Sequence, residues 1–269
     1  MEPKPAQWGA EFGAWFTDTA IAEAYSNRPP YPQDAIELLV SLIADRPRVV
    51  LDAGSGTGDL ARRLAPHVDR VDAVDASAAM LDQGRRLPGG THPHLNWQHA
   101  TAEEAALTPP YALVTAGESL HWMDWAVVLP RFGRALAPHG VVAIVERDWE
   151  GPPALTARLR PVFARYGTVR DFRALDVVAE IERRGLFTRT GERRCGPQPW
   201  RPTIEEYLDC RHSQRGFSRT HLGAGSARAF DEAVRATLED LVDAGGLRRT
   251  RGRLELAVEA RVAWGVPRL

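Results

Sequence analysis

The fold of this chain is decided by the stretch Val49-Val50-Leu51-Asp52-Ala53-Gly54-Ser55-Gly56-Thr57-Gly58-Asp59-Leu60. An apolar, partly β-branched run ends in an acid, and three glycines follow at every second position. This pattern predicts a buried parallel strand, a tight turn and the start of a helix. Glycines allow positive φ angles and let a ligand approach the main chain closely. We therefore expect a nucleoside-like ligand at the carboxyl end of the first strand of a doubly wound sheet.

The spacing of the glycines indicates the kind of ligand. Dinucleotide-binding turns use G-x-G-x-x-G, so that free amides meet a pyrophosphate. Here the glycines are Gly54, Gly56 and Gly58, and an acid, Asp59, comes next. Together with Asp52 it favours a ligand that carries an ammonium and a sulfonium over one that carries phosphates.

Residues 51–58, which read Leu-Asp-Ala-Gly-Ser-Gly-Thr-Gly, resemble motif I of the class I S-adenosylmethionine (SAM) dependent methyltransferases. The resemblance implies a Rossmann-like α/β fold, with a doubly wound, mostly parallel seven-stranded sheet, an antiparallel last strand and a helical cap insertion. It implies SAM as cofactor and S-adenosylhomocysteine as product. The cofactor contacts that it implies in this stretch are Asp52, Gly54, Ser55 and Gly56.

Length, composition and charge fit one globular domain over residues 1–269. The formal net charge of −1 gives no general attraction to nucleic acid or acidic membranes. No apolar run approaches the roughly 18 residues of a membrane span, and the amino end does not read as a signal peptide. Cys195 and Cys210 fit neither a redox pair nor a metal site. We expect a cytoplasmic protein without metal, nucleic-acid or membrane partners, as a monomer or a homodimer.

The chain divides into an amino-terminal lid (residues 1–32), a SAM-binding core (33–150) and substrate-side helices with terminal strands (151–269). The lid is expected to be irregular and extended, because prolines interrupt residues 25–32. Its Y-x-x-x-R-P-x-Y-P pattern resembles the amino-terminal signature of the type 11 branch of the family, which implies that Tyr25 and Arg28 help to close the cofactor site. The alternative is an arm that only packs its aromatic residues on the core.

A second strand is expected over residues 70–75, with Ser77 capping the helix that follows. Asp75 lies 23 residues after Asp52, which matches the step to the acid that binds a ribose in nucleotide-binding sheets. The resemblance places Ala76 and Met80 beside the adenine. A third strand is expected over residues 95–99, and the resemblance then implies cofactor contacts from Thr101, Ala102 and Glu103, with Thr101 standing where the family usually has an acid.

A fourth strand over residues 112–116 precedes Gly117-Glu118-Ser119-Leu120-His121-Trp122. Carboxyl ends of parallel strands line the ligand crevice, so this segment should face the reacting methyl group. The His121-Trp122 pair resembles that of the trans-aconitate methyltransferase-like and type 11 enzymes. Ala116, Glu118 and Trp122 are therefore expected at the cofactor, Trp122 also at the substrate, and His121 and Glu118 in catalysis. The alternative is that His121 is structural or merely solvated.

The second half is expected to hold helices near residues 155–166 and 172–185, a strand over 187–194 and a capping box at Thr203. A helix over 227–242 and a strictly alternating strand over 254–264 follow. The segment 151–222 is expected to determine acceptor specificity. It supplies a further candidate catalytic residue, His212, and the candidate substrate residues Trp200, Tyr207, Arg211 and Arg215.

The function expected from the sequence is methyl transfer from SAM to an oxygen, nitrogen or carbon atom of a small molecule, such as a carboxylate or a secondary metabolite. A carboxylate acceptor would need an arginine but no base, whereas a phenol or an amine would need His121, His212 or Glu118. Two alternatives remain open at this point. One is a non-catalytic SAM-fold binding protein, and the other is a nicotinamide-dependent oxidoreductase on a similar sheet.

Overall fold

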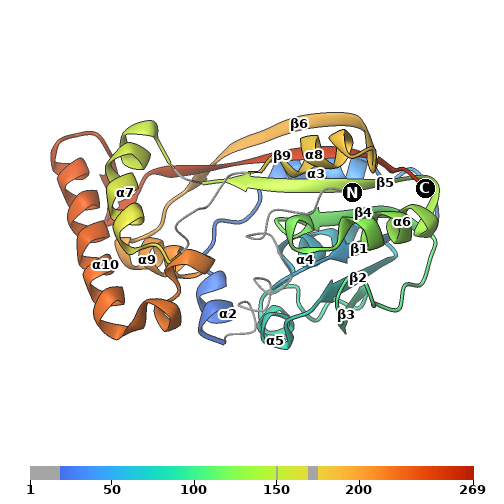
Figure 1. Cartoon of the computed structure of the whole chain (residues 1–269), viewed down its shortest axis with the longest axis horizontal. Coiled ribbons are helices and arrows are strands. Elements are labelled where there is room, and N and C mark those ends of the chain that lie inside the picture. The colour runs from blue at the N-terminus through green and yellow to red at the C-terminus, as the bar shows by residue number, and fades with distance from the viewer. Residues whose placement is uncertain (1–18, 150, 169–174) are drawn as a thin grey trace.

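The computed structural model describes residues 19–149, 151–168 and 175–269, and a seven-stranded sheet runs through it (Figure 1). The strand order is β3-β2-β1-β4-β5-β9-β6. β9 pairs antiparallel with both of its neighbours, and the pairings among the first five strands are parallel. The expected mostly parallel sheet with an antiparallel last strand is confirmed. The strands are β1 Val49–Ala53, β2 Arg70–Asp75, β3 Leu95–His99, β4 Tyr111–Gly117, β5 Leu136–Asp148, β6 Phe187–Trp200 and β9 Leu256–Pro267.

Helices cover both faces of the sheet because its central strands are apolar on both faces. Val50 and Leu113 belong to one core, shared with α3 and α4, whereas Leu51 and Val114 belong to the other, shared with α6 and α8. Neighbouring residues of one strand thus point into different cores. The flanking elements are α3 Gln33–Ser41, α4 Asp59–Leu64, η3 Ala65–His67, α5 Ala78–Arg86, η4 Leu120–Trp122, α6 Trp125–Ala135 and α8 Val177–Arg183.

A group of helices with its own core, called the cap below, lies at the end of the sheet toward which β5 points (Figure 1). Its residues include Leu159, Tyr207, Phe230 and Leu238, all fully buried. Thr203 forms the expected capping box with Glu206. The cap consists of α7 Pro153–Tyr166, α9 Ile204–His212, η5 Arg215–Phe217 and α10 Arg219–Asp243, and a short hairpin of β7 Arg249–Thr250 and β8 Arg253–Leu254 follows it.

The described part of the lid, residues 19–32, is called the arm below. It differs from the expectation of an irregular segment, because α2 Thr19–Tyr25 is a helix. Ile21 and Ala22 pack on Met80 of α5, so contact with the core stabilises a short helix that has little periodicity of its own. Residues 26–32 are free of regular structure, as the prolines predict. The aromatic residues expected in the first part of the lid, Trp8, Phe12, Trp15 and Phe16, lie outside the described residues.

Two elements of the second half have other bounds than expected. The helix expected over residues 172–185 begins at Val177, where Asp176 accepts a hydrogen bond from the Ala179 amide; residues 172–174 lie outside the described part. β6 continues to Trp200, beyond residue 194, because β9 pairs with it as far as Leu256. The strand expected over residues 187–194 is therefore the first part of a longer strand.

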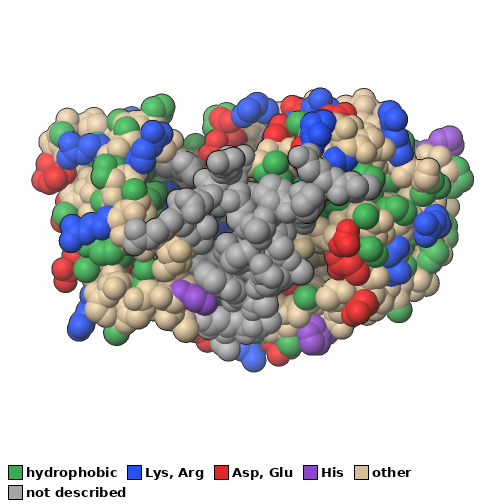
Figure 2. All heavy atoms as spheres, viewed as in Figure 1, with side chains coloured by type: hydrophobic (Ala, Val, Ile, Leu, Met, Phe, Trp, Pro, Cys, Tyr) green, Lys and Arg blue, Asp and Glu red, His purple; other side chains and the backbone are tan. Residues whose placement is uncertain are grey.

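The surface and the cysteines show no specialised feature in the part described. No helix there has both the length and the apolar character to cross a membrane, and no group of three metal-ligating side chains gathers there. Basic and acidic side chains are interspersed over the described parts of the face in Figure 2. Cys195 and Cys210 are free and buried.

Gly84→Ala should destabilise the protein although alanine favours helices. A Cβ at Gly84 would lie 2.6 Å from Cη2 of Trp97 and 2.8 Å from the backbone oxygen of Thr57. Trp97 is held by a hydrogen bond of 2.8 Å from its indole to the Gly90 carbonyl, so it does not yield easily. We expect a loss of about 1–3 kcal/mol in the free energy of unfolding, measured by urea denaturation.

The matched control is Gly225→Ala in α10, where an added Cβ has no neighbour within 4 Å. Gly225 lies two residues after the non-helical Gly223, so the full helix-interior preference does not apply, and the substitution should change the stability by less than about 1 kcal/mol. Equal effects of the two substitutions would contradict the packing argument.

Candidate functional site

The glycine turn between β1 and α4 presents bare backbone at one residue. Gly54, Gly56 and Gly58 have φ angles of 67°, 56° and 74°. An added Cβ would lie 2.5 Å from Cβ of Ser119 at Gly54 and 2.4 Å from Trp97 at Gly58, so these two glycines allow close packing. At Gly56 an added Cβ would meet only a ring carbon of Tyr25, 3.9 Å away. The gap between the Gly56 backbone and the Tyr25 ring would thus just admit a methyl group, so a larger ligand on this turn would require the Tyr25 ring to move.

Asp75 at the end of β2 is joined to this turn. Its Oδ2 accepts from the Gly56 amide at 2.7 Å, and its Oδ1 accepts from the Ser77 amide at 2.8 Å. Each oxygen keeps a further lone pair for a ligand hydroxyl. Burial raises the pKa of Asp75, and the two amide bonds oppose this. The turn also holds an unsatisfied polar atom. Oγ of Ser55, the residue before Gly56, is buried without a hydrogen-bond partner among the described residues.

Asp52 supports the turn from inside the protein. It is 1% exposed, its Oδ1 accepts from Thr115 Oγ1 at 2.8 Å, and its Oδ2 accepts from the Ala61 amide at 3.2 Å. Burial raises its pKa from 3.8 to about 7. Asp52 is enclosed in the core between β1, β4 and α4, where it holds the two strands and the helix together, and the cofactor contact expected for it stays a prediction.

Asp59 binds the arm. Its Oδ2 accepts from the Tyr31 amide at 3.0 Å and lies 3.5 Å from Nη1 of Arg147. A buried guanidinium therefore pairs with this charge, and the interpretation that the charge selects a cationic cofactor stays a prediction. Arg147 was not identified from the sequence, although its place at the carboxyl end of β5 could have indicated it.

Contacts of two arginines, Arg147 and Arg28, hold residues 25–31 against the core. Arg147 donates to the Pro29 carbonyl at 2.5 Å, and its guanidinium lies 4.4 Å from the centre of the Tyr31 ring. Arg28 donates to Oγ and to the carbonyl of Ser213 at 2.7 and 2.8 Å and lies 4.0 Å from the centre of the Tyr25 ring. The arm thus bridges the glycine turn and the end of α9, which fixes Tyr25 over Gly56.

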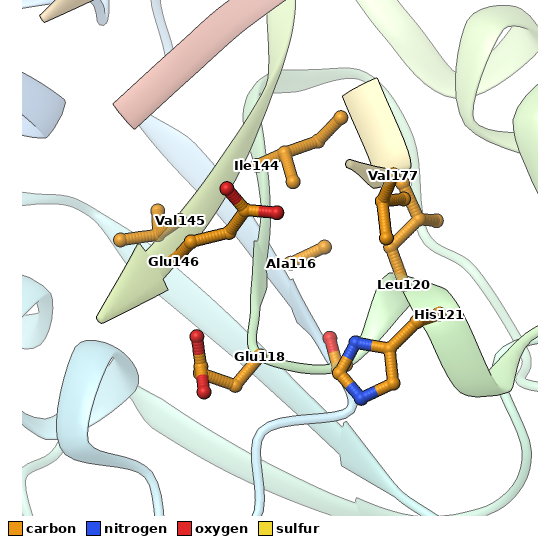
Figure 3. Close-up of a pocket in the computed structure, with 9 residues that line it drawn as sticks. Ala116, Glu118, Leu120, His121, Ile144, Val145, Glu146 and Val177 are labelled. Atoms are coloured by element: carbon orange, nitrogen blue, oxygen red, sulfur yellow. The ribbon is translucent and has the colours of Figure 1, made fainter. Parts of the chain in front are cut away.

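A pocket opens at the carboxyl ends of β4 and β5 (Figure 3). Glu118, Glu146 and His121 border it, and Leu120, Ile144 and Val177 form its apolar side. Glu118 has a φ of 54°, and its Oε1 accepts from the Arg147 amide at 2.8 Å. Burial raises the pKa of Glu146, while the charge of Arg261 opposes this.

The pocket adjoins the glycine turn. Ser119, which lines it, donates to the Ala53 carbonyl at 2.7 Å. Ala116 lines it from β4 and is fully buried. Trp122 packs against His121 with 4.5 Å between ring centres, and both rings are partly exposed. The structure therefore brings His121, Glu118, Ala116 and Trp122 together beside the turn.

The residues expected near an adenine have different environments. Met80 is buried against α2, Ala76 is exposed, and its carbonyl lies 3.0 Å from Nε2 of His99. Thr101 is exposed and Ala102 is buried. Glu103 accepts from the Asp124 amide at 2.7 Å and so joins the loops that follow β3 and β4. This contact gives Glu103 a structural role in addition to the cofactor contact expected for it.

His212 does not reach the pocket. It is 2% exposed, and its two ring nitrogens lie 2.6 Å from the Phe217 carbonyl and 2.6 Å from Oδ1 of Asp231. Both nitrogens are engaged within the cap, which gives His212 a structural role, and the catalytic role expected for it stays a prediction.

The candidate substrate residues of the cap form an aromatic cluster around one arginine. Trp200 stacks on Tyr207 with 5.9 Å between ring centres and meets Trp149 edge-on at 5.7 Å. Arg211 is 2% exposed and donates to Tyr207 Oη at 2.6 Å. The side chain of Arg215 lies outside the described part of the structure.

Comparisons with known proteins agree with this geometry. Residues 50–140 match the family model described as a methyltransferase domain. An uncharacterized methyltransferase of Mycobacterium tuberculosis is 36% identical over 128 residues, which are 47% of this chain and 50% of the relative. Trans-aconitate 2-methyltransferase of Methylobacterium radiotolerans is 34% identical over 139 residues, which are 49% of this chain and 50% of the relative. The chain thus spans about half the length of these curated relatives.

Solved structures share the fold over most of the chain. A protein of Anaeromyxobacter dehalogenans assigned as a type II methyltransferase superposes with a TM-score of 0.63 at 23% identity, over 89% of this chain and 97% of that one. Residues 50–140 thus match a methyltransferase domain, and the described chain has the fold of a methyltransferase structure.

SAM is the cofactor of this class of domain, and the methyltransferase domain described here offers suitable groups for it. The open side of Gly56 lies below an aromatic ring, Asp75 has free lone pairs at the end of β2, and Ser55 Oγ lacks a partner among the described residues. Asp75 would accept from the ribose hydroxyls, and Tyr25 would cover the cofactor. The bare backbone of Gly56 would let the cofactor lie close to the turn.

The stability of the methyltransferase domain should fall as the pH rises through the range in which Asp52 titrates. Since the pKa of Asp52 is about 7 in the folded state and ordinarily 3.8, the folded state keeps a proton that the unfolded state has lost. The free energy of unfolding should therefore decrease between about pH 4 and 7, by up to about 1.4 kcal/mol per pH unit from this group.

Asp52→Asn should remove this contribution, so that the stability difference between wild type and variant changes with pH. Urea denaturation at several pH values measures it. Asp82→Asn, at an exposed side chain of α5, is the control and should give a constant difference. A constant difference for Asp52→Asn as well would contradict the assignment.

Proposed function

We propose that this protein transfers a methyl group from SAM to a small-molecule acceptor. The observation that carries the proposal is the coupled arrangement of the Gly56 turn, the Asp75 carboxylate and the Tyr25 ring, which together form one cradle. The pocket bordered by His121 and Glu118 lies beside that cradle. The methyltransferase relatives support the reaction class. The cap would determine which acceptor binds.

SAM supplies a methyl group that its own sulfonium activates, so the protein needs mainly to align the reactants and exclude water. Tyr25 and the arm would cover the cofactor from the solvent side, since Arg28 and Arg147 fasten the arm on both sides. Asp75 would fix the ribose, and the buried apolar wall of Ile144, Leu120 and Val177 would keep water from the pocket.

His121 is the residue that we propose to accept a proton when the nucleophile arrives protonated. It borders the pocket, and unlike His212 it is partly exposed. Glu118 positions the end of β5 through its bond to the Arg147 amide. This division of roles is supported by the contacts of Glu118, which tie one of its oxygens to the backbone.

Asp75→Ala should weaken SAM binding by about 1–3 kcal/mol, a factor of roughly 5 to 150, because the ribose would lose a charge-assisted acceptor. Isothermal titration calorimetry with SAM and with S-adenosylhomocysteine measures this. Asp82→Ala, at an exposed carboxylate on the neighbouring helix α5, is the control and should bind as the wild type does. Unchanged affinity in a folded Asp75→Ala protein would contradict the proposal that Asp75 and the Gly56 turn bind the cofactor.

Turnover on a panel of phenols, amines, carboxylic acids and carbon acids, followed by mass spectrometry, tests the reaction itself. A product heavier by one methyl group is expected. Tight SAM binding without any methylated product would favour the non-catalytic binding protein instead.

His121→Asn should lower kcat at neutral pH by about 100-fold or more on a protonated acceptor, without changing SAM affinity. Glu118→Gln keeps the acceptor oxygen for the Arg147 amide and should have a smaller effect. The reverse order of the two effects would assign the proton transfer to Glu118.

A further inference from the structure

Arg211 of α9 is a buried arginine that lacks a counter-charge. The residue is 2% exposed. Its guanidinium donates to Tyr207 Oη at 2.6 Å and, at 3.5 Å, to Oε1 of Gln214, and its Nε is buried without an acceptor. Within the described ranges, no carboxylate lies within 4.0 Å of it. Two of its five N–H groups thus have an acceptor, and both acceptors are uncharged.

Two other arginines with enclosed side chains, Arg147 at 3% and Arg184 at 9% exposure, are each paired with an acid. Arg147 lies 3.5 Å from Asp59, and Arg184 lies 2.7 Å from Glu180. Burying a charge without a partner is costly, so an arginine kept in this state needs another source of stabilisation. Aromatic rings supply part of it: the guanidinium of Arg211 lies 4.4 Å from the ring centre of Trp149 and about as close to Tyr207 and Phe163.

The position of Arg211 connects it to the site. Trp149 follows β5, the strand that borders the pocket. Arg28 of the arm donates to Ser213, two residues after Arg211, and Arg147 donates to the Pro29 carbonyl, one residue after Arg28. The guanidinium groups of Arg28, Arg147 and Arg211 thus lie around the junction of the arm, β5 and α9. Among the described residues, Asp59 alone has a carboxylate within 4.0 Å of any of the three, and it pairs with Arg147.

We infer that Arg211 anchors a carboxylate of the methyl acceptor, which rests on the proposed function above. A planar carboxylate suits a guanidinium because two N–H groups can donate to it in parallel. The rings of Trp149, Trp200 and Tyr207 favour an acceptor with a flat apolar body beside its carboxylate. The pocket of Figure 3 is unsuitable for this anion because Glu118 and Glu146 border it. Arg211 Nε is enclosed, and Arg28 fastens the arm to Ser213 at the end of α9. The acceptor therefore enters when the arm separates from α9.

Calorimetry with small probes tests the inference on the whole protein saturated with S-adenosylhomocysteine. The probes are benzoate and trans-cinnamate, their neutral amides, and phenyl phosphate. The variants are Arg211→Met, which removes the charge at similar length, and Arg211→Lys, which keeps the charge and loses the fork. Arg158→Met is the control, because Arg158 lies in the same cap and forms an exposed ion pair of 3.6 Å with Asp240.

We expect at least one of the two acids to bind wild type and Arg158→Met equally, and to bind Arg211→Met at least about 10-fold more weakly. Arg211→Lys should lie between them. The amides should bind the wild type more weakly than the acids and should not distinguish it from Arg211→Met. Failure of both acids to bind wild type, equal binding of acid and amide, or an unchanged Arg211→Met would overturn the inference, and tighter binding of phenyl phosphate would assign the site to a phosphate.

Two further measurements keep the outcomes separate. If Arg211→Met does not fold, Arg211→Lys and the comparison of acid with amide on wild type decide. The proposed function is tested independently, by whether wild type binds S-adenosylhomocysteine at all. If it does not, that proposal fails, and the titration of the acids without cofactor still tests Arg211.

Discussion

The hydrogen bond from the Gly56 amide to Asp75 Oδ2, 2.7 Å long, joins the two strand ends on which the site is built. It requires a turn with positive φ at Gly54, Gly56 and Gly58, and it holds a carboxylate whose pKa burial raises. β1 pairs in parallel with residues 70–74 of β2, so the ends of the two strands lie at the same edge of the sheet. The turn and the acid therefore act as one rigid unit, and the arm places Tyr25 above it.

The acids of the glycine motif show how one residue type can take different roles within a few positions. Asp52 lies in the core, where Thr115 and the Ala61 amide bind it and where its pKa rises to about 7. Asp59 lies at the start of α4 and binds the arm through the Tyr31 amide and Arg147. Burial governs the first, and a cation pairs with the second.

The arginines divide the site into regions of different charge. Arg147 and Arg28 fasten the arm, and Arg211 lies among the aromatic rings of the cap. Glu118 and Glu146 border the pocket, and Arg261 also contacts Glu146, at 3.2 Å. An acceptor that spans both regions would meet a cationic aromatic end and an acidic end, which restricts its orientation more than an apolar pocket would.

The sequence by itself determined the sheet, because apolar runs and turn residues are local signals. The bounds of β2 and β3, the Ser77 cap and the Thr203 capping box agree with expectations drawn from neighbouring residues, and the antiparallel β9 agrees with the family resemblance. Only the tertiary structure decided the roles of Arg147, Asp59, His212 and Arg211. Each depends on partners far away in the chain: Arg147 on Pro29, Asp59 on Tyr31, His212 on Asp231 and Arg211 on Trp149. Spacing along a sequence indicates which backbone forms, whereas the charge and exposure of a side chain depend on what the fold packs against it.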